Sequence, residues 1–201
     1  MYVLENKNES ERLEIQSKMD QYCPIKEIAN LKFPEQGSLL DAGCGTGLLS
    51  KTIHDIFPHL NIEGCDISDD RIDYAQQKYS NFSFFKKDLT KDMLERKYDF
   101  IVNRYVAHHL GVSNYDKVLR NFHQALSKNG SLGIIDVENN IVGLGTTDKW
   151  LSERLHNIKK QFYGDLYIGR KIPSMLHKIG FNNIEYKVEV MQFKGSSLAK
   201  E

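Results

Sequence analysis

A glycine-rich turn at 41–47, with the sequence DAGCGTG, constrains the fold of this 201-residue chain more than any other feature. It follows the apolar run 38–42 and precedes an amphipathic helical segment at 48–56. Glycines at alternate positions permit positive φ and let a ligand approach the backbone. The pattern predicts a strand, a tight turn and a helix whose first N–H groups and partial positive charge face a ligand. The alternative is a turn built for tight packing alone.

Apolar periodicity predicts alternating helices and strands through most of the chain. The expected helices are Glu9–Tyr22, a short one from Pro24, 48–56, one capped by Ser68 that runs to Tyr79, and one that carries Val118 to Leu126 and stops at Asn129-Gly130. The expected strands are 38–42, Asn61–Asp66, Phe82–Phe85, Tyr98–Asn103 and Ser131–Val137. This alternation predicts an α/β fold with a doubly wound, mostly parallel sheet and helices on both faces.

The C-terminal part departs from strict alternation. Two consecutive helices are expected there, Thr147–Tyr163 and Ile172–Ile179, and Gly180 closes the second. The last expected element is a sixth, half-buried strand, Phe181–Gln192, with apolar residues at alternate positions: Ile184, Tyr186, Val188 and Val190.

Composition and charge argue against several classes of function. Lys+Arg and Asp+Glu both total 27, so the basic excess typical of a phosphate-binding surface is missing and no nucleic-acid partner is expected. The three cysteines lie far apart, which indicates neither a metal site nor a disulfide framework. No apolar run approaches the roughly eighteen residues of a membrane span. The polar N-terminal stretch lacks the apolar region of a signal peptide, so we expect a cytoplasmic protein that binds no membrane.

The residues that follow the last glycine narrow the choice of ligand. A dinucleotide fingerprint requires glycine or alanine at position 48, and a phosphate-binding loop requires Lys-Ser/Thr after Gly47; Leu48 and Leu49 stand there instead. The pattern fits a ligand without phosphate, an adenosine that carries a methionine tail. Asp66, about twenty residues further on at the end of the second strand, can accept both ribose hydroxyls. The alternative is that Asp66 initiates the next helix.

Four motifs in order make the chain similar to the class I, seven-strand S-adenosylmethionine methyltransferases. They are Leu39–Gly47, Gly64–Ser68, 87–89 (Lys-Asp-Leu) and Tyr98–Asn103, and the resemblance covers most of 38–137. A further segment, Tyr105–Leu110, resembles the one that follows the fourth strand in the small-molecule branch. The resemblance implies a Rossmann-like methyltransferase fold. It also implies methyl transfer from S-adenosylmethionine to a small-molecule acceptor, with S-adenosylhomocysteine as product.

The resemblance also implies roles at the cofactor. Asp66 would bind the ribose and Ile67 would pack on the adenine, whose amino group Asp88, beside Leu89, would bind. The alternative for Asp88 is a helix N-cap, and one residue can do both. The methionine tail would lie against five residues of the turn: Asp41, Gly43, Cys44, Gly45 and Gly47.

Two further groups of cofactor residues follow from the resemblance. Asn103 and Arg104, at the end of the fourth strand, would offer backbone carbonyls to the methionine ammonium. The N-terminal segment resembles a helical lid over the cofactor, with Tyr2, Arg12 and Gln16 as the candidate contacts. The alternative for these three is a plain surface helix.

We expect one domain over 1–201, divided into an N-terminal helical lid (1–37), a cofactor-binding core (38–138) and acceptor-side helices with the last strand (139–201). The family fold ends with an antiparallel seventh strand, and little after Gln192 can supply it, so the sheet is expected to be incomplete or the chain to be a shortened form. A partner could cover the edge, and we expect a monomer or a homodimer.

Acceptor selectivity is expected in the segment Asn139–Arg170. Three aromatic residues there either line an apolar pocket or pack in the core: Trp150, Phe162 and Tyr167.

Methyl transfer from a sulfonium is an in-line displacement that depends mainly on alignment and on exclusion of water. A general base helps only if the acceptor is protonated. His108 and His109 are the close pair of titratable groups after the fourth strand, so one of them is the candidate base. The alternative is that one caps a helix or packs under the sheet. We expect Arg104 and Tyr105 to shape the acceptor pocket or bind a carboxylate.

The segment 103–106 (NRYV) lacks the two prolines of the Asn/Asp-Pro-Pro-Tyr motif in amino-methylating nucleic-acid enzymes, which argues against adenine or glutamine amide as acceptor. Two other functions are compatible with the fold. A non-catalytic cofactor-binding or partner-binding module would bind without transferring a methyl group. A nicotinamide oxidoreductase would need a differently spaced glycine turn.

Overall fold

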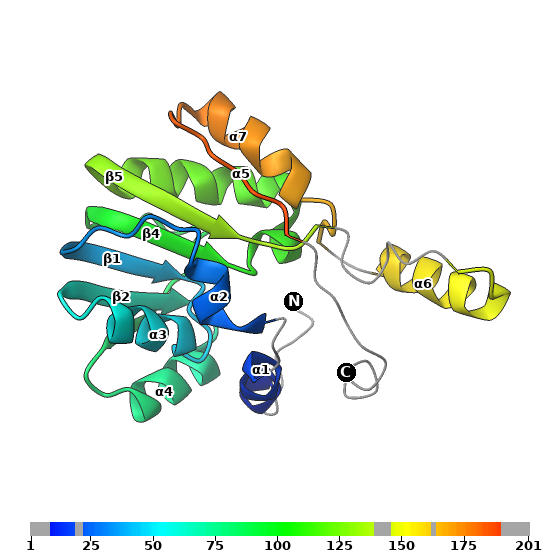
Figure 1. The fold of residues 1–201 in the computed structure, drawn as a ribbon, viewed down its shortest axis with the longest axis horizontal. Coiled ribbons are helices and arrows are strands. Elements are labelled where there is room, and N and C mark those ends of the chain that lie inside the picture. Colours follow the sequence, from blue (N-terminus) through cyan, green and yellow to red (C-terminus); the bar gives the residue numbers. More distant parts are fainter. Residues whose placement is uncertain (1–8, 19–21, 139–145, 162–163, 190–201) are drawn as a thin grey trace.

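Five parallel strands form the centre of the part of the chain that the computed structural model describes, residues 9–18, 22–138, 146–161 and 164–189 (Figure 1). They are β1 (Gly37–Ala42), β2 (Leu60–Asp66), β3 (Ser83–Lys86), β4 (Tyr98–Arg104) and β5 (Leu126–Ile135). Their order in the sheet is β3-β2-β1-β4-β5 and every pairing is parallel. The strand order reverses between β1 and β4, which is where an open α/β sheet binds its ligands. The predicted α/β fold class is confirmed.

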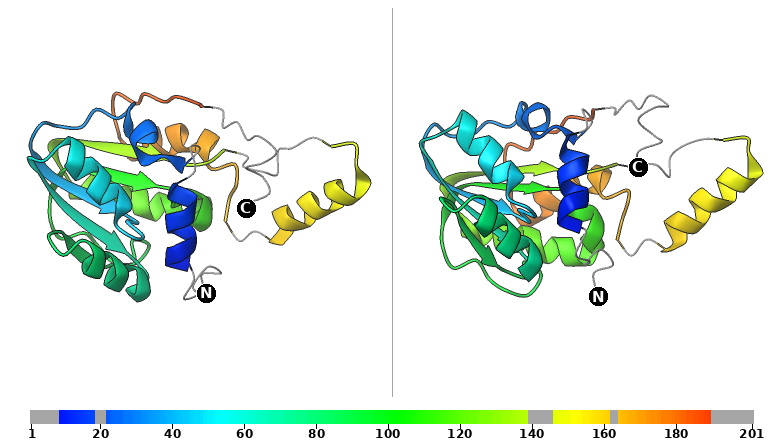
Figure 2. Two further views of the ribbon diagram at one scale, coloured as in Figure 1. Left: turned by 60° about the horizontal axis from the view of Figure 1, so that its bottom comes forward. Right: turned by 90° about the horizontal axis from the view of Figure 1, so that it is seen from below.

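Both faces of the sheet are covered by helices (Figures 1 and 2). Leu39 and Leu40 are both fully buried and pack in different clusters, as expected for a strand covered on two sides. Leu39 packs with residues of α2 (Pro24–Ile28) and α3 (Leu48–Ile56). Leu40 packs with residues of α5 (Ala107–Ala125) and α7 (Ile172–Ile179).

A further helix, α4 (Asp69–Lys78), covers β3. Its residues Ile72 and Ala75 pack against Phe84 of that strand and against Cys44 of the glycine turn. The turn is therefore held between a strand and a helix that follow it in sequence.

Helix α5 differs most from the sequence-based expectation. It begins at Ala107, eleven residues before Val118, and includes both histidines that were singled out. Gly111, with φ of 69°, interrupts the helical dihedrals within α5. The helix ends at Ala125, so the predicted stop at Asn129-Gly130 is wrong, because these two residues already belong to β5.

The predicted sixth strand is wrong for residues 181–189, which form no strand, while 190–192 lie outside the described residues. Tyr186 and Val188 are 76% and 72% exposed, so the alternating pattern faces solvent here. The segment is instead held by side chains: Lys32 binds Glu185 at 2.8 Å and Asn30 binds Glu189 at 3.1 Å.

The two remaining long helices are shorter than expected. Helix α1 (Glu9–Ser17) ends before the predicted Tyr22, and α6 (Lys149–Gln161) falls within the predicted 147–163. Helix α6 stands away from the sheet in all three views (Figures 1 and 2). Its Trp150 is 65% exposed and lies against Arg154, so the expected pocket is not formed by Trp150; Phe162 lies outside the described residues.

Candidate functional site

The candidate site lies at the carboxyl edge of the sheet, where the glycine turn after β1 meets the ends of β2 and β4. Gly43, Gly45 and Gly47 have φ of 84°, 52° and 76°, values that favour glycine. A Cβ on Gly43 would overlap Cγ2 of Val106, and one on Gly47 would lie 2.7 Å from Cζ of Phe84. A Cβ on Gly45 would meet only Leu13, at 3.7 Å. Tight packing therefore explains two of the glycines, and Gly45 is the one of the three where a Cβ would meet no clash.

Most N–H groups of the turn are used inside the protein. Gly43 and Cys44 both donate to the carbonyl of Cys65, at 2.7 and 2.9 Å, and Gly47 donates to Cys44 at 2.9 Å. Gly45 donates to Oδ2 of Asp66 at 3.0 Å. A phosphate-binding turn presents a cluster of free N–H groups. Because most N–H groups of this turn already have partners inside the protein, the turn is not built to bind an anion.

Asp66 ends β2 and faces the turn. Besides Gly45, its carboxylate accepts the N–H of Ser68 at 3.0 Å and lies 3.7 Å from Nη1 of Arg71. Only 5% of Asp66 is exposed, whereas Ile67 is 43% exposed. The bond to Ser68 shows that Asp66 also supports the start of α4, so the two expected roles are compatible.

Asp41 lies beneath the turn and is 1% exposed. Its carboxylate accepts the hydroxyl of Ser50 at 2.7 Å, which ties β1 to α3. Burial raises the pKa of Asp41 to about 6, although the hydrogen bond from Ser50 and the positive charge of Arg104 oppose the rise. Asp41 therefore supports the turn from below.

Asp88 lies after β3 and its carboxylate is already engaged. It accepts the N–H and hydroxyl of Thr90, at 3.0 and 2.6 Å, and the Lys91 ammonium at 2.7 Å. Burial raises the pKa of Asp88, and the hydrogen bonds from Lys91 and Thr90 outweigh that effect and lower it. The expected alternative, a helix N-cap, is wrong because a turn and no helix follows Asp88 before β4. Leu89 is buried in the core.

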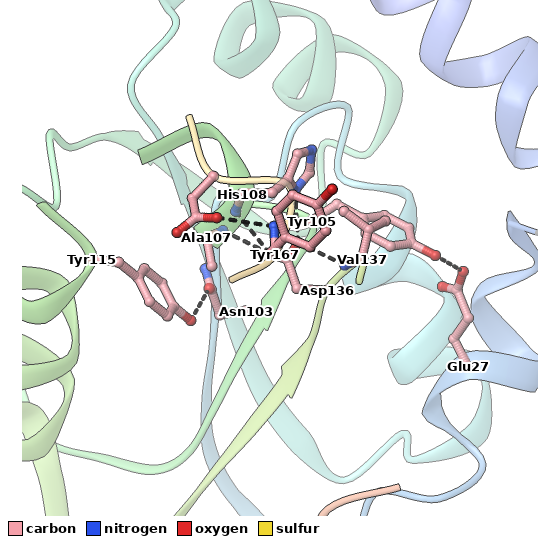
Figure 3. A network of polar contacts seen from close by, with 10 residues as sticks. Glu27, Asn103, Tyr105, Ala107, His108, Tyr115, Asp136, Val137 and Tyr167 are labelled. Carbon is pink, nitrogen blue, oxygen red and sulfur yellow. Dashed lines mark hydrogen bonds and ion pairs between the residues drawn. The ribbon is translucent and has the colours of Figure 1, made fainter. Parts of the chain in front are cut away.

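Asn103 and Arg104 end β4. The Asn103 side chain is fully buried, donates to the Ala42 carbonyl at 2.6 Å and accepts the Tyr115 hydroxyl at 2.8 Å (Figure 3). Arg104 donates through Nε to Glu27 of α2. Both side chains therefore stabilise the end of β4. The prediction for these two residues concerns their backbone carbonyl groups, which these side-chain contacts do not involve.

The two histidines at the start of α5 differ in environment. Nδ1 of His108 lies 2.7 Å from Oδ1 of Asp136, the residue that follows β5 (Figure 3). The Asp136 carboxylate is 1% exposed and also accepts the N–H groups of Ala107 and Val137, both at 2.7 Å. Because an ionised carboxylate only accepts hydrogen bonds, the proton of a neutral His108 lies on Nδ1 and Nε2 is left as the basic nitrogen.

His109 stacks on His108 with ring centroids 3.8 Å apart. Burial lowers the pKa of His109 to about 3, and the nearby positive charges of His108, Arg71 and Arg12 add to the effect. His109 is therefore neutral throughout the physiological range, and His108 is the histidine of the pair that a carboxylate orients.

Helix α1 covers this edge of the sheet. Leu13 lies over Gly45, and Glu14 forms an ion pair with Lys78 of α4 at 2.7 Å. Arg12 and Gln16 are joined by a 3.4 Å hydrogen bond. The structure thus places two of the three predicted lid residues on a helix over the turn, and Tyr2 lies outside the described residues.

Sequence reasoning missed Asp136 and Glu27. Asp136 is an acid directly after an apolar strand, as Asp66 is, and the same positional argument would have found it. Glu27 carries no local signal, because its partners are 77 and 78 residues away in the sequence.

Within the described residues, no group of three or more His, Cys, Asp or Glu side chains could hold a metal ion. None of the helices in the same part of the chain is long and apolar enough to cross a membrane.

Comparison with known proteins gives a family match over most of the chain. A family model described as "Methyltransferase domain" matches residues 15–186. Malonyl-(acyl-carrier protein) O-methyltransferase of Bacillus cereus is 32% identical over 112 residues, which are 54% of this chain and 41% of that protein. Isoflavone 4'-O-methyltransferase of Medicago truncatula is 33% identical over 104 residues, 50% of this chain and 27% of that protein. The chain thus matches less than half the length of these relatives.

Solved structures show the same fold. Human N-acetylserotonin methyltransferase, solved in complex with S-adenosylmethionine, superposes with a TM-score of 0.67 at 19% identity, covering 89% of this chain and 51% of that one. The YcgJ protein of Bacillus subtilis superposes with a TM-score of 0.58 at 18% identity, covering 78% and 66%. At these identities the likeness concerns the fold.

Proposed function

Because the chain belongs to the methyltransferase-domain family, we propose that it transfers a methyl group from S-adenosylmethionine to a small-molecule acceptor and releases S-adenosylhomocysteine. One observation carries the proposal. The open Gly45 position, with the Asp66 carboxylate beside it, lies at the same sheet edge as the oriented base His108. A ribose-binding acid and a base at one edge fit a donor and an acceptor that meet there.

The cofactor roles proposed for the turn follow from its geometry. The methionine tail passes over Gly45, where a side chain would stand in its way. Gly43, Cys44 and Gly47 shape the turn and Asp41 supports it from below. Asn103 and Arg104 offer carbonyl oxygens at the end of β4 to the ammonium group.

The adenosine end is proposed to lie along β2 and β3. Asp66 accepts the ribose hydroxyls, and Ile67, half exposed at the end of β2, packs on the adenine. Asp88, beside Leu89, reaches the adenine amino group when its exposed partner Lys91 moves aside. Arg12 and Gln16 of α1, with Tyr2, close over the ligand.

S-adenosylmethionine supplies an activated methyl group on a sulfonium. What this chain contributes is alignment, exclusion of water by α1, and a base for the acceptor proton. In the proposed mechanism Nε2 of His108 takes the acceptor proton, and Asp136 holds the ring through Nδ1 and stabilises the resulting imidazolium. His109, buried and neutral, serves as packing beneath it.

The base favours one class of acceptor. A carboxylate is already ionised at neutral pH and needs no base, whereas a hydroxyl has to lose its proton as the methyl group arrives. The similarity to an isoflavone O-methyltransferase agrees with a hydroxyl acceptor, and the similarity to malonyl-(acyl-carrier protein) O-methyltransferases favours a carboxyl acceptor. The His108–Asp136 pair leads us to propose the hydroxyl.

Calorimetric titration with S-adenosylmethionine, S-adenosylhomocysteine and NADH tests the cofactor. We expect the first two to bind and NADH not to bind. Asp66→Asn should weaken S-adenosylmethionine binding roughly tenfold or more, because hydrogen bonds to a charged group contribute about 1.5–3 kcal/mol. Asp70→Asn, an exposed acid four residues on, is the matched control and should bind normally. Binding of NADH alone would point to an oxidoreductase instead.

Transfer of a labelled methyl group to a panel of phenols, alcohols, carboxylates and amines tests the reaction. With an accepted hydroxyl substrate, His108→Ala and Asp136→Asn should lower kcat about 10²–10⁴-fold while S-adenosylmethionine affinity is kept. His59→Ala, an exposed histidine, is the control. Binding without transfer to any member of the panel would favour the non-catalytic module.

The remaining parts of the proposal concern the protein's surroundings. The balanced charge supports a small-molecule acceptor over nucleic acid. We propose a cytoplasmic protein that acts as a monomer or a homodimer, organised as one domain over 1–201.

A further inference from the structure

Glu27, on helix α2, holds two side chains at the carboxyl end of β4. Its carboxylate accepts Nε–H of Arg104. It also accepts the hydroxyl of Tyr105 at 2.6 Å (Figure 3). Arg104 also donates to the Tyr22 carbonyl at 3.1 Å. The side chains of Glu27 and Arg104 are only 12% and 18% exposed, so water weakens this ion pair less than one at the surface. The network joins the N-terminal segment to the strand that leads into the candidate site.

Tyr105 carries the backbone strain in this network. Its φ of 56° lies in the left-handed region, which is uncommon for a residue with a Cβ. The side chain is held from three directions. Glu27 binds the hydroxyl, the Arg104 guanidinium lies 4.4 Å from the ring centre, and Tyr22 packs edge-on at 5.9 Å. Such a conformation persists only where its surroundings determine it, and strain of this kind clusters at functional sites.

The left-handed turn at Tyr105 decides where the candidate base lies. After it the chain enters α5, with the N–H groups of Ala107 and His108 directed at Asp136, at 2.7 and 3.4 Å. The His108 ring is edge-on to the Tyr105 ring at 6.5 Å and bonds to Asp136 through Nδ1. A different backbone conformation at residue 105 would redirect the first turn of α5 and with it His108.

We infer that Glu27 is a positioning residue that places His108 on Asp136 by holding Arg104 and Tyr105, so that the base is assembled only when helix α2 is docked on the end of β4. The inference rests on the proposed function through the role of His108. It couples the N-terminal segment, which carries the lid, to the acceptor side of the site, although Glu27 itself touches no reacting atom.

The test reads the imidazole of His108 directly and needs no acceptor. Nitrogen-15 NMR of the histidine side chains, at about pH 8 where an ordinary histidine is neutral, reports which nitrogen carries the proton. In the wild-type protein we expect the Nδ1–H form of His108. Glu27→Ala should give a mixture of the two tautomers, and amide exchange over 105–110 should become roughly tenfold faster.

Further variants keep the test decisive. If Glu27→Ala does not fold, Glu27→Gln and Tyr105→Phe each remove one part of the network and should shift the His108 tautomer in the same direction by less. Glu35→Ala removes an exposed glutamate eight residues on and should leave the His108 signals unchanged. Adding Tyr105→Gly to Glu27→Ala should restore the Nδ1–H form of His108, because glycine adopts the left-handed conformation without side-chain contacts that stabilise it.

A merely structural brace predicts a different result. Glu27→Ala and Tyr105→Phe would then lower the melting temperature and leave the His108 tautomer and the exchange over 105–110 as in the wild type, and the inference would be overturned. Titration of the same samples with S-adenosylmethionine tests the proposed function separately from the role of Glu27. Missing S-adenosylmethionine binding counts against the proposed function, and the His108 signals still decide the role of Glu27.

Discussion

Individual carboxylates near the carboxyl ends of the strands act in different ways because they differ in burial and partners. Asp66 faces the space above Gly45 and Asp136 orients a histidine, whereas Asp41 is enclosed beneath the turn with Ser50. An ionised carboxylate in such an enclosure loses its hydration, so its protonated form is favoured. Asp41 is thus a site where pH acts on stability.

The pKa of Asp41 near 6, against an ordinary 3.8, fixes the sign of this effect. Between about pH 4 and pH 6 the folded protein keeps a proton that the unfolded chain has released, so the free energy of unfolding falls as the pH rises through this window. The difference corresponds to about 3 kcal/mol. Asp41→Asn stays neutral and can still accept from Ser50, so it should gain stability relative to the wild type as the pH rises.

Urea denaturation of both proteins at a series of pH values measures this gain. Asp73→Asn, which changes an exposed acid on α4, should run parallel to the wild type across the window. Parallel curves for Asp41→Asn as well would mean that Asp41 titrates near its ordinary pKa in the folded protein.

Among the elements, the glycine turn has to pack tightly and is also proposed to admit a ligand, and different glycines serve these two purposes. All three glycines have positive φ, but a Cβ on Gly43 would clash with Val106, whereas a Cβ on Gly45 would meet only Leu13, at 3.7 Å. The packing of the turn and its capacity to admit a ligand can therefore be changed independently.

We predict opposite consequences for alanine at these two positions. Gly43→Ala adds a clash to the backbone strain and should lose about 1–3 kcal/mol more stability than Gly45→Ala. Gly45→Ala should stay folded and bind S-adenosylmethionine at least roughly tenfold more weakly, because its methyl group occupies the ligand space. Thermal unfolding and calorimetric titration measure the two effects.

Adding Val106→Ala to Gly43→Ala should recover part of the lost stability, since it removes the clashing methyl group. Unchanged S-adenosylmethionine affinity in Gly45→Ala would show that the ligand does not pass over this position.

At the scale of the whole molecule, helix α1 covers the edge of the sheet at the glycine turn and α6 stands away from the sheet (Figure 2). A ligand held between the turn and α1, the proposed lid, should reduce the mobility of α1 and leave that of α6 unchanged. Ligand binding at a hundredfold excess over Kd also stabilises the folded state by about 2.7 kcal/mol through mass action.

Hydrogen exchange with and without S-adenosylhomocysteine tests this arrangement. We expect slower exchange in α1 and in the turn, and no change in α6, which serves as the internal control. Protection in α6 with none in α1 would place the ligand elsewhere and would contradict the lid.

Much of the core was predictable because its signals are local. The strand at 98–103, the turn at 41–47 and Asp66 were all recognised from apolar runs and glycine spacing over a few residues. The wrong strand at 181–189 shows the limit of such patterns. Alternating apolar residues indicate that a segment could place one face on a sheet, but strand formation also requires a neighbouring strand edge to pair with. In this segment side-chain contacts to the loop at 30–32 are formed instead.

The sequence by itself predicted the fold class, through its alternating helices and strands, because apolar periodicity is a local signal. The glycine turn, with Leu48 and Asp66, indicated the kind of donor and the sheet edge where it is expected, because backbone freedom at 43–47 depends only on the local sequence. The tertiary structure alone decided that His108 and not His109 is oriented by a carboxylate, and that Glu27 reaches Arg104 and Tyr105. These contacts span 28 to 78 residues, and only the packing of β4, β5 and α2 brings their partners together.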